Sequence, residues 1–228
     1  MIENQIVTQK KGRYFLSQDP NDKIEQLWIV CHGYGQLANY FLKWFNPIIN
    51  DKILIVAPEG FHRFYLEGFS GKVGASWMTK EDRLNDITDY KNFLDKVMLE
   101  ITPLLNSACY IHALGFSQGV ATISRWVYHT KFKVDSLSIW AGKIPHDLSY
   151  DLFANKLNTL NLKLFYGNND PFYSLKQVKN ELNLIKENNI NFSAFEYDGK
   201  HKIESAPLNQ LYIEIENERI QKKQSTNS

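Results

Sequence analysis

The sequence feature that most constrains the fold is a series of short apolar runs that alternate with amphipathic helical patterns. The runs are largely apolar on both faces and lie at residues 27–31, 53–57, 109–114, 137–141, 162–166 and 192–197. Such runs are typical of strands buried in a parallel sheet. The segments between them have apolar residues at three- and four-residue spacing, which predicts helices over 38–45, 87–105, 118–129, 175–188 and 203–220. The chain is therefore predicted to form an α/β fold with a mostly parallel central sheet and helices on both faces.

The length of 228 residues is enough for one sizeable hydrophobic core. We therefore expect residues 1–220 to form a single α/β domain. Residues 221–228 have no apolar side chain and are predicted to be a disordered C-terminal tail. At the other end, residues 6–8 and 13–16 flank a Lys-Lys-Gly segment, which predicts an N-terminal hairpin.

The charge balance and the cysteines exclude several classes of protein. Lysine and arginine number 26 against 25 aspartate and glutamate residues, so the chain lacks the basic excess of a nucleic-acid-binding protein. Cys31 and Cys109 each lie in an apolar run and are interpreted as core residues rather than a disulfide. No segment has the pattern of a signal peptide, a membrane span or a metal site. We expect a soluble cytoplasmic protein without metal or cofactor.

The segment Gly115-Phe116-Ser117-Gln118-Gly119 lies between an apolar run and a predicted helix. In that context G-x-S-x-G predicts the nucleophile elbow of an α/β-hydrolase fold. The serine then occupies the tip of a strained turn, where a side chain at either glycine would collide with neighbouring backbone. Ser117 is the predicted nucleophile, and the backbone N–H of Gln118 is a predicted oxyanion donor. The alternative is a plain turn in which Ser117 only caps the helix.

The base and the acid of this fold follow the nucleophile in the order acid, then histidine. His201 follows the last apolar run in a loop that contains a glycine, and it is the predicted base, although it could be an ordinary surface histidine. Asp170 ends the segment Gly167-Asn168-Asn169-Asp170 after the preceding run and is the predicted acid that orients His201. Asp198 is a competitor because it is close to His201 in sequence, but a turn position suits a capping role.

Two further segments are predicted to complete the site. His32-Gly33-Tyr34-Gly35-Gln36 follows the first apolar run, so the backbone N–H of Tyr34 is the second predicted oxyanion donor, and His32 is expected to order the loop. Residues 58–83 interleave aromatic residues with glycines, and a loop this long is usually functional. The predicted substrate-binding side chains are Tyr34, Phe64, Tyr65 and Trp77. Alternatively this stretch only covers a sheet edge, or it serves a homodimer.

The first of these loops also fits a different enzyme class. Gly33 to Ala38 matches G-x-G-x-x-A after a strand, and Glu59 lies 24 residues beyond Gly35. That spacing is close to a dinucleotide-binding fingerprint. A dinucleotide site would leave the elbow, Asp170 and His201 without a joint explanation, so it stays a minor alternative.

Taken in order, these motifs resemble the carboxylesterase and phospholipase group of the α/β-hydrolase superfamily, which includes the acyl-protein thioesterases. The matching segments are Leu114–Gly119 (G-F-S-Q-G), Cys31–Gly35 (H-G-x-G), Ala57-Pro58, Ser76-Trp77, Gly167–Asp170 (G-x-x-D) and Tyr197–His201 (Y-x-G-x-x-H, here one residue shorter). The resemblance implies a serine esterase that cleaves carboxylic ester or thioester bonds without a cofactor and has a small lid or none.

The chain departs from that group at a few positions. Gln36 stands where the group usually has aspartate, Val120 where many members have a second glycine, and Pro171-Phe172 where V-V-P is common. The segment 60–83 differs most from that group. We expect a serine hydrolase that acts on a small-molecule ester or acyl substrate through an acyl-enzyme. A serine peptidase or another acyl-transfer enzyme is the first alternative, and a non-catalytic binding protein is the second.

Overall fold

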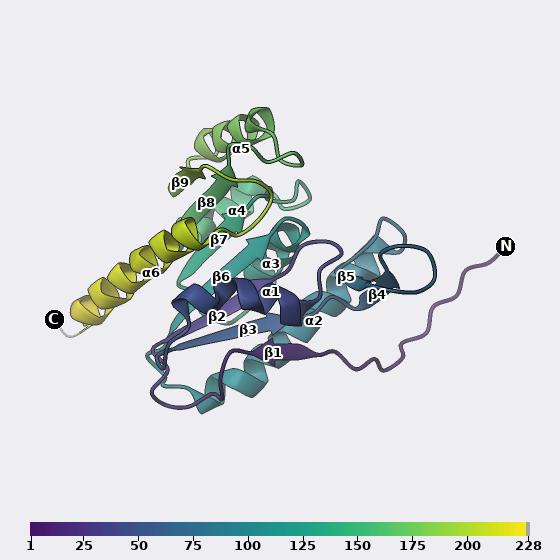
Figure 1. Cartoon of the computed structure of the whole chain (residues 1–228), viewed down its shortest axis with the longest axis horizontal. Coiled ribbons are helices and arrows are strands. Elements are labelled where there is room, and N and C mark those ends of the chain that lie inside the picture. Colours follow the sequence, from purple (N-terminus) through teal and green to yellow (C-terminus); the bar gives the residue numbers. More distant parts are fainter. Residues whose placement is uncertain (227–228) are drawn as a thin grey trace.

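Seven strands form one sheet within residues 1–226, which the computed structural model describes (Figure 1). Their order is β1-β3-β2-β6-β7-β8-β9, and every neighbouring pair is parallel except β1 with β3. The strands are β1 (Tyr14–Leu16), β2 (Gln26–Cys31), β3 (Ile53–Pro58), β6 (Tyr110–Phe116), β7 (Ser136–Trp140), β8 (Asn161–Gly167) and β9 (Phe192–Tyr197). The predicted mostly parallel α/β sheet is confirmed.

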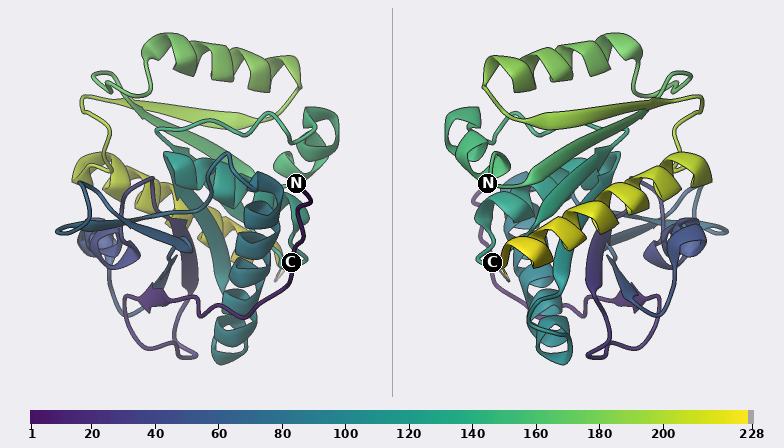
Figure 2. Two further views of the ribbon diagram at one scale, coloured as in Figure 1. Left: turned by 90° about the vertical axis from the view of Figure 1, so that its right-hand side faces the viewer. Right: turned by 90° about the vertical axis from the view of Figure 1, so that its left-hand side faces the viewer.

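Helices cover both faces of the sheet (Figure 2). They are α1 (Ala38–Leu42), which continues as the 3-10 helix η1 (Lys43–Ile48), α2 (Arg83–Ile101), α3 (Gln118–His129), α4 (Tyr150–Leu157), α5 (Leu175–Glu187) and α6 (Ser205–Thr226); a short 3-10 turn, η2 (Thr102–Leu104), follows α2. Helices α2, α3, α4 and α5 pack on one face, and α1, η1 and α6 pack on the other. No helix among residues 1–226 is long and apolar enough to cross a membrane.

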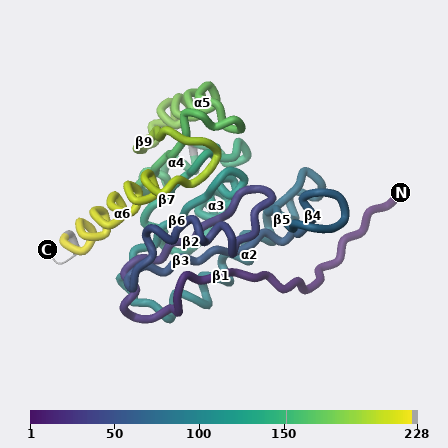
Figure 3. The backbone as a smooth tube through the Cα atoms, in the orientation of Figure 1, coloured from purple at the N-terminus to yellow at the C-terminus, as the bar shows by residue number. Residues whose placement is uncertain are grey.

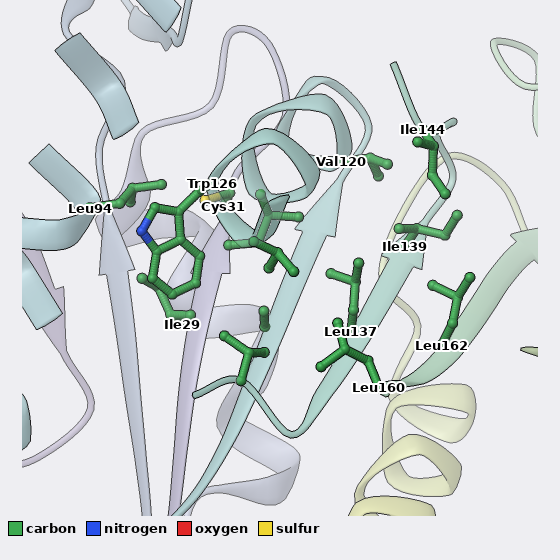
Figure 4. Packing of buried hydrophobic residues seen from close by; sticks show 14 of the residues in the cluster. Ile29, Cys31, Leu94, Val120, Trp126, Leu137, Ile139, Ile144, Leu160 and Leu162 are labelled. Atoms are coloured by element: carbon green, nitrogen blue, oxygen red, sulfur yellow. The ribbon is translucent and has the colours of Figure 1, made fainter. Parts of the chain in front are cut away.

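The hydrophobic core lies in two layers, one on each face of the sheet. On the first face Trp126 of α3 lies beside Leu94 of α2 and over Ile29, and Leu137 of β7 lies beside Leu160 in the same cluster (Figure 4). On the second face Trp28, the neighbour of Ile29 in β2, joins a separate buried cluster. Because both faces are covered, strand residues of either orientation are buried, which explains why the apolar runs show no alternation.

The two chain ends differ from the prediction. Residues 1–12 form no regular structure and extend from the sheet as an arm (Figure 3), so the predicted N-terminal hairpin is wrong. Tyr14–Leu16 instead pair with Val56–Pro58, because the edge of β3 offers them backbone partners. At the other end α6 continues to Thr226, so residues 221–226 of the expected tail are helical, while 227–228 lie outside the described residues. An ion pair of 2.6 Å between Lys222 Nζ and Asp135 Oδ1 holds this polar part of the helix.

The stretch 58–83 forms a hairpin between β3 and α2. Its strands, β4 (His62–Tyr65) and β5 (Val73–Ser76), are antiparallel. A bridge between Gln36 and Ala75 joins the hairpin to the loop after β2. The hairpin is therefore attached to the carboxyl-terminal edge of the sheet, where β2 and β6 both end.

Candidate active site

Ser117 lies at a very tight turn between β6 and α3. Its φ of 53° and ψ of −117° are unusual for a residue with a side chain. A Cβ atom on Gly115 would lie 2.4 Å from the carbonyl oxygen of Gly119, and one on Gly119 would lie 2.1 Å from that of Cys31. Both positions therefore require glycine. The N–H of Ser117 donates to the carbonyl oxygen of Trp140, 2.9 Å away, which ties the turn to β7.

His201 connects Ser117 to Asp170 by two hydrogen bonds. Nε2 of His201 lies 2.9 Å from Oγ of Ser117, and Nδ1 lies 2.6 Å from Oδ2 of Asp170. Asp170 follows β8, and His201 follows β9, the parallel neighbour of β8. The carboxyl ends of these strands therefore bring together three side chains that are far apart in the sequence.

The Asp170 carboxylate is fixed and shielded from water. Its other oxygen, Oδ1, accepts the backbone N–H groups of Phe172 and Tyr173 at 2.8 and 2.9 Å, and its side chain has no exposed surface. The competitor Asp198 lies elsewhere: it is exposed, and its Oδ1 accepts the side-chain amide of Asn169 at 2.9 Å. Of the two carboxylates considered, the structure thus places Asp170 against His201.

The loop after β2 approaches the start of α3. The amide oxygen of Gln36 accepts the N–H of Gly33 at 2.7 Å, and the N–H of Gly35 donates to the carbonyl oxygen of Ala75 at 2.8 Å. In the described part of the chain, neither the N–H of Tyr34 nor that of Gln118 donates to a protein acceptor. Two unpaired donors therefore come from the two segments predicted to supply them.

His32 orders this loop and is not a second base beside Ser117. Its Nε2 accepts the N–H of Gly60 at 3.0 Å, so the proton must be on Nδ1, which donates to the carbonyl oxygen of Gly33 at 2.8 Å. The imidazole is completely buried, and this burial lowers the pKa of His32 to about 4. The ring is therefore neutral near pH 7 and serves as a structural link.

The side chain of Gln118 links the elbow to the segment after β5. Its Oε1 accepts the N–H of Trp77 at 3.1 Å, and its Nε2 donates to the carbonyl oxygen of Met78 at 3.0 Å. The prediction that Trp77 lines the substrate pocket does not agree with its position. Trp77 is only 1% exposed, stacks on His32 and donates from Nε1 to the carbonyl oxygen of that residue. An indole held in this way forms part of the core.

The other predicted substrate-binding aromatic residues lie on the loop after β2 and on the hairpin. Tyr34 is 63% exposed and packs against Phe64 at a ring-centroid distance of 5.1 Å, and Tyr65 is also exposed. A cleft of about 570 Å³ opens beside them. It is lined by Gly35, Gln36, Leu37, Tyr40, Phe41, Trp44, Leu66, Gly71, Lys72 and Val73. Gly35, the residue that follows Tyr34 in the sequence, is thus part of the wall of this largely apolar cleft.

A second cavity, of about 630 Å³, lies at the opposite edge of the sheet. It is lined by residues before β2, β3 and β6 and by Arg219, Lys222 and Lys223 of α6. Because parallel strands start at that edge and Ser117 lies where they end, this cavity is remote from the Ser117–His201 pair. Among the described residues, no group of three or more histidine, cysteine, aspartate or glutamate side chains could hold a metal ion.

Glu59 does not have the free carboxylate that a dinucleotide site requires. It is completely buried, and its oxygens accept hydrogen bonds from Arg13 and Arg63 and from the N–H of Ala38. Burial alone raises the pKa of Glu59, but these hydrogen bonds outweigh it and the pKa lies below its ordinary value. Glu59 therefore joins the residue before β1, the hairpin and α1.

Two features of the site were not predicted from the sequence. Phe172 packs against His201, and the side chain of Gln36 holds the loop that carries Tyr34. In the sequence, Gln36 and Phe172 only depart from the pattern of the family that the chain resembles. Phe172 lies two residues from the candidate acid, and Gln36 lies within the candidate oxyanion loop. A departure from the family pattern at such a position is the signal that could have identified both residues.

Comparison with known proteins agrees with this architecture. A sequence model of the phospholipase/carboxylesterase family matches residues 14–217. No curated protein sequence matches the chain. Acyl-protein thioesterase 2 from Zea mays superposes with a TM-score of 0.67 at 16% identity, over 92% of this chain and all of that one. A carboxylesterase from Bacillus cereus gives 0.64 at 14% identity, over 91% of this chain and 94% of that one. At these identities the structural likeness establishes the fold.

Proposed function

Because the chain belongs to the phospholipase/carboxylesterase family of serine hydrolases, we propose that it cleaves carboxylic ester or thioester bonds through an acyl-enzyme formed on Ser117. The observation that carries this proposal is the continuous chain of hydrogen bonds from Ser117 through His201 to Asp170. A serine hydroxyl is a poor nucleophile at neutral pH, and a base within hydrogen-bond distance corrects this.

In the first half-reaction Oγ of Ser117 attacks the acyl carbon while Nε2 of His201 removes its proton. Asp170 stabilises the imidazolium that forms, because its Oδ2 already accepts from Nδ1. The carbonyl oxygen becomes an oxyanion that the N–H groups of Tyr34 and Gln118 stabilise. One such donor is typically worth about 3 kcal/mol in the transition state. The C–O or C–S bond then breaks, and His201 returns the proton to the departing oxygen or sulfur.

In the second half-reaction water replaces the leaving group. His201 takes a proton from the water as the water oxygen attacks the acyl carbon. The bond between that carbon and Oγ of Ser117 then breaks, His201 returns the proton to Oγ, and a carboxylic acid is released. We assign the acyl group to the cleft between α1 and the hairpin. This cleft is mostly apolar, and its wall includes Gly35, which follows the predicted oxyanion donor Tyr34. Tyr34, Phe64 and Tyr65 would flank its entrance.

The proposal is tested with a fluorophosphonate probe, which reacts with an activated serine. We expect the wild type and Ser193→Ala, a change at an exposed serine of β9, to be labelled equally and Ser117→Ala not at all. A folded wild-type protein that stays unlabelled would contradict catalysis by Ser117. Hydrolysis of p-nitrophenyl esters, thioesters and aminoacyl amides then separates an esterase from a peptidase, and activity confined to the amides would overturn the esterase assignment.

A further inference from the structure

A large apolar side chain stands exposed beside His201. Phe172 is 75% exposed, and its ring meets the imidazole of His201 edge to face, with ring centroids 5.1 Å apart and the planes inclined by 67°. The other aromatic ring against His201, that of Phe116, is only 2% exposed. Phe116 therefore belongs to the core, whereas most of the Phe172 ring has no covering partner.

The position of Phe172 is fixed by the carboxylate that holds His201. Oδ1 of Asp170 accepts the N–H of Phe172 at 2.8 Å, while Oδ2 binds His201. Pro171 lies between Asp170 and Phe172 in the sequence, and its ring restricts the backbone of this turn further. The ring is thus presented next to the imidazole by a short and well-anchored turn.

The Phe172 ring lies next to the imidazole that must protonate the leaving oxygen. The departing oxygen must approach Nε2 of His201 to receive its proton, so the carbon attached to that oxygen comes close to the groups that surround the imidazole. The cleft assigned to the acyl group is instead lined by the loop after β2, by α1 and η1, and by the hairpin. Phe172 therefore contacts His201 outside the cleft assigned to the acyl group.

We propose that Phe172 determines specificity for the leaving group and selects alcohols that carry a flat ring, such as arylmethyl alcohols. The inference rests on the proposed esterase function. As His201 protonates the oxygen and the C–O bond breaks, the acyl group stays on Ser117 and the alcohol departs from the Phe172 ring. Ring-on-ring packing adds to the effect of apolar burial and should contribute about three- to tenfold in kcat/KM.

The test uses three acetate esters that share one acyl group. Benzyl, n-hexyl and ethyl acetate all release weakly acidic alcohols, so differences among them report on contacts rather than on leaving ability, and hexyl matches the apolar size of benzyl without a ring. We expect Phe172→Ala to lower kcat/KM for benzyl acetate by about three- to tenfold relative to ethyl acetate. Phe172→Tyr should restore the wild-type ratio, and Phe172→Leu should not.

The other outcomes are equally decisive. An equal loss with benzyl and hexyl acetate would show general apolar contact and overturn ring selection. An equal loss with all three esters would mean that Phe172 only positions His201, and no change would mean that the ring does not contact the leaving group. Leu99→Ala, at an exposed position of α2, serves as the matched surface control. If the wild type is neither labelled by fluorophosphonate nor active on any ester, the proposed function itself fails.

Discussion

Nε2 of His201 lies 2.9 Å from Oγ of Ser117, although 84 positions separate the two residues in the sequence. The sheet accounts for this proximity. Ser117 follows β6, His201 follows β9, and only β7 and β8 lie between these strands in the sheet. Because all four strands are parallel, their carboxyl ends lie at one edge, and the loops that leave this edge can meet. The pair therefore depends on strand order rather than on local sequence.

The first prediction concerns the acid. Asp170→Asn keeps the size of the side chain but removes the charge that stabilises protonated His201, so we expect kcat to fall by about 10³- to 10⁴-fold. Asp198→Asn changes an exposed carboxylate that contacts Asn169, and its kcat should stay within about twofold of wild type. Steady-state hydrolysis of p-nitrophenyl acetate and thermal unfolding of both variants provide the measurements. The opposite ranking of the two variants would assign the acid to Asp198.

The second prediction concerns the closeness of the elbow to the loop after β2. In Gly119→Ala the new methyl group would lie 2.1 Å from the carbonyl oxygen of Cys31, so the backbone has to move. Overpacking of this kind typically costs about 1–3 kcal/mol. We expect a lower melting temperature in differential scanning calorimetry and a lower kcat, because Tyr34 and Gln118 no longer converge. A variant with wild-type melting and activity would show that these segments are not packed as described.

Most of the sheet could be predicted from the sequence because its five central strands, between the edge strands β1 and β9, are buried on both faces. Residues such as Trp28 and Ile29 are both fully buried although they point in opposite directions, and this produces the uninterrupted apolar runs. The order of the motifs likewise placed Ser117, Asp170 and His201 after three of these strands. The apolar runs and the order of the motifs are both present in the sequence, so these features could be predicted without knowledge of the tertiary contacts.

The remaining features depend on contacts that a pattern does not contain. Trp77 lies in a segment rich in aromatic residues and glycines, which is why it was predicted to line a pocket. Its partners, His32 and Gln118, are distant in the sequence, and their contacts place it in the core. The polar end of α6 contains no apolar residue, and its ion pair with Asp135 is known only from the fold. Phe172 is an exposed aromatic residue, and only its contact with the imidazole of His201 in the folded chain connects it with the active site.

The third prediction concerns the effect of pH on stability through His32. Its pKa is about 4 in the folded protein, whereas an unfolded histidine has a pKa of about 6.5. Between these values the unfolded chain binds a proton that the folded chain does not, so acidification favours unfolding. The contribution of His32 to the free energy of unfolding is complete above pH 6.5. It is lost as the pH falls to about 4, which lowers the free energy of unfolding by about 3 kcal/mol. Burial also lowers the pKa of His112, which acts in the same direction.

Urea unfolding at a series of pH values measures this loss, and NMR identifies its source. Long-range ¹H–¹⁵N spectra should show His32 as the Nδ1–H tautomer down to about pH 5, because Nε2 accepts from Gly60. The exposed His146 in the same sample provides an internal comparison. A signal from His32 that titrates at the ordinary histidine value, or that shows the Nε2–H tautomer, would contradict this description of the loop.

The last prediction tests the assignment of the acyl group to the cleft between α1 and the hairpin. Leu66 lines this cleft, and its Cδ2 packs closely over Gly35 and Gly74, yet the residue is 45% exposed, so its truncation should cost little stability. If the acyl chain packs against Leu66, Leu66→Ala removes apolar contacts worth about 1 kcal/mol or more. We expect kcat/KM for p-nitrophenyl octanoate to fall by about five- to tenfold, with little change for the acetate, whose acyl group is too short to reach Leu66. Leu152→Ala, at an exposed leucine of α4, should change neither substrate. Equal effects of Leu66→Ala on both esters would place the acyl chain outside this cleft.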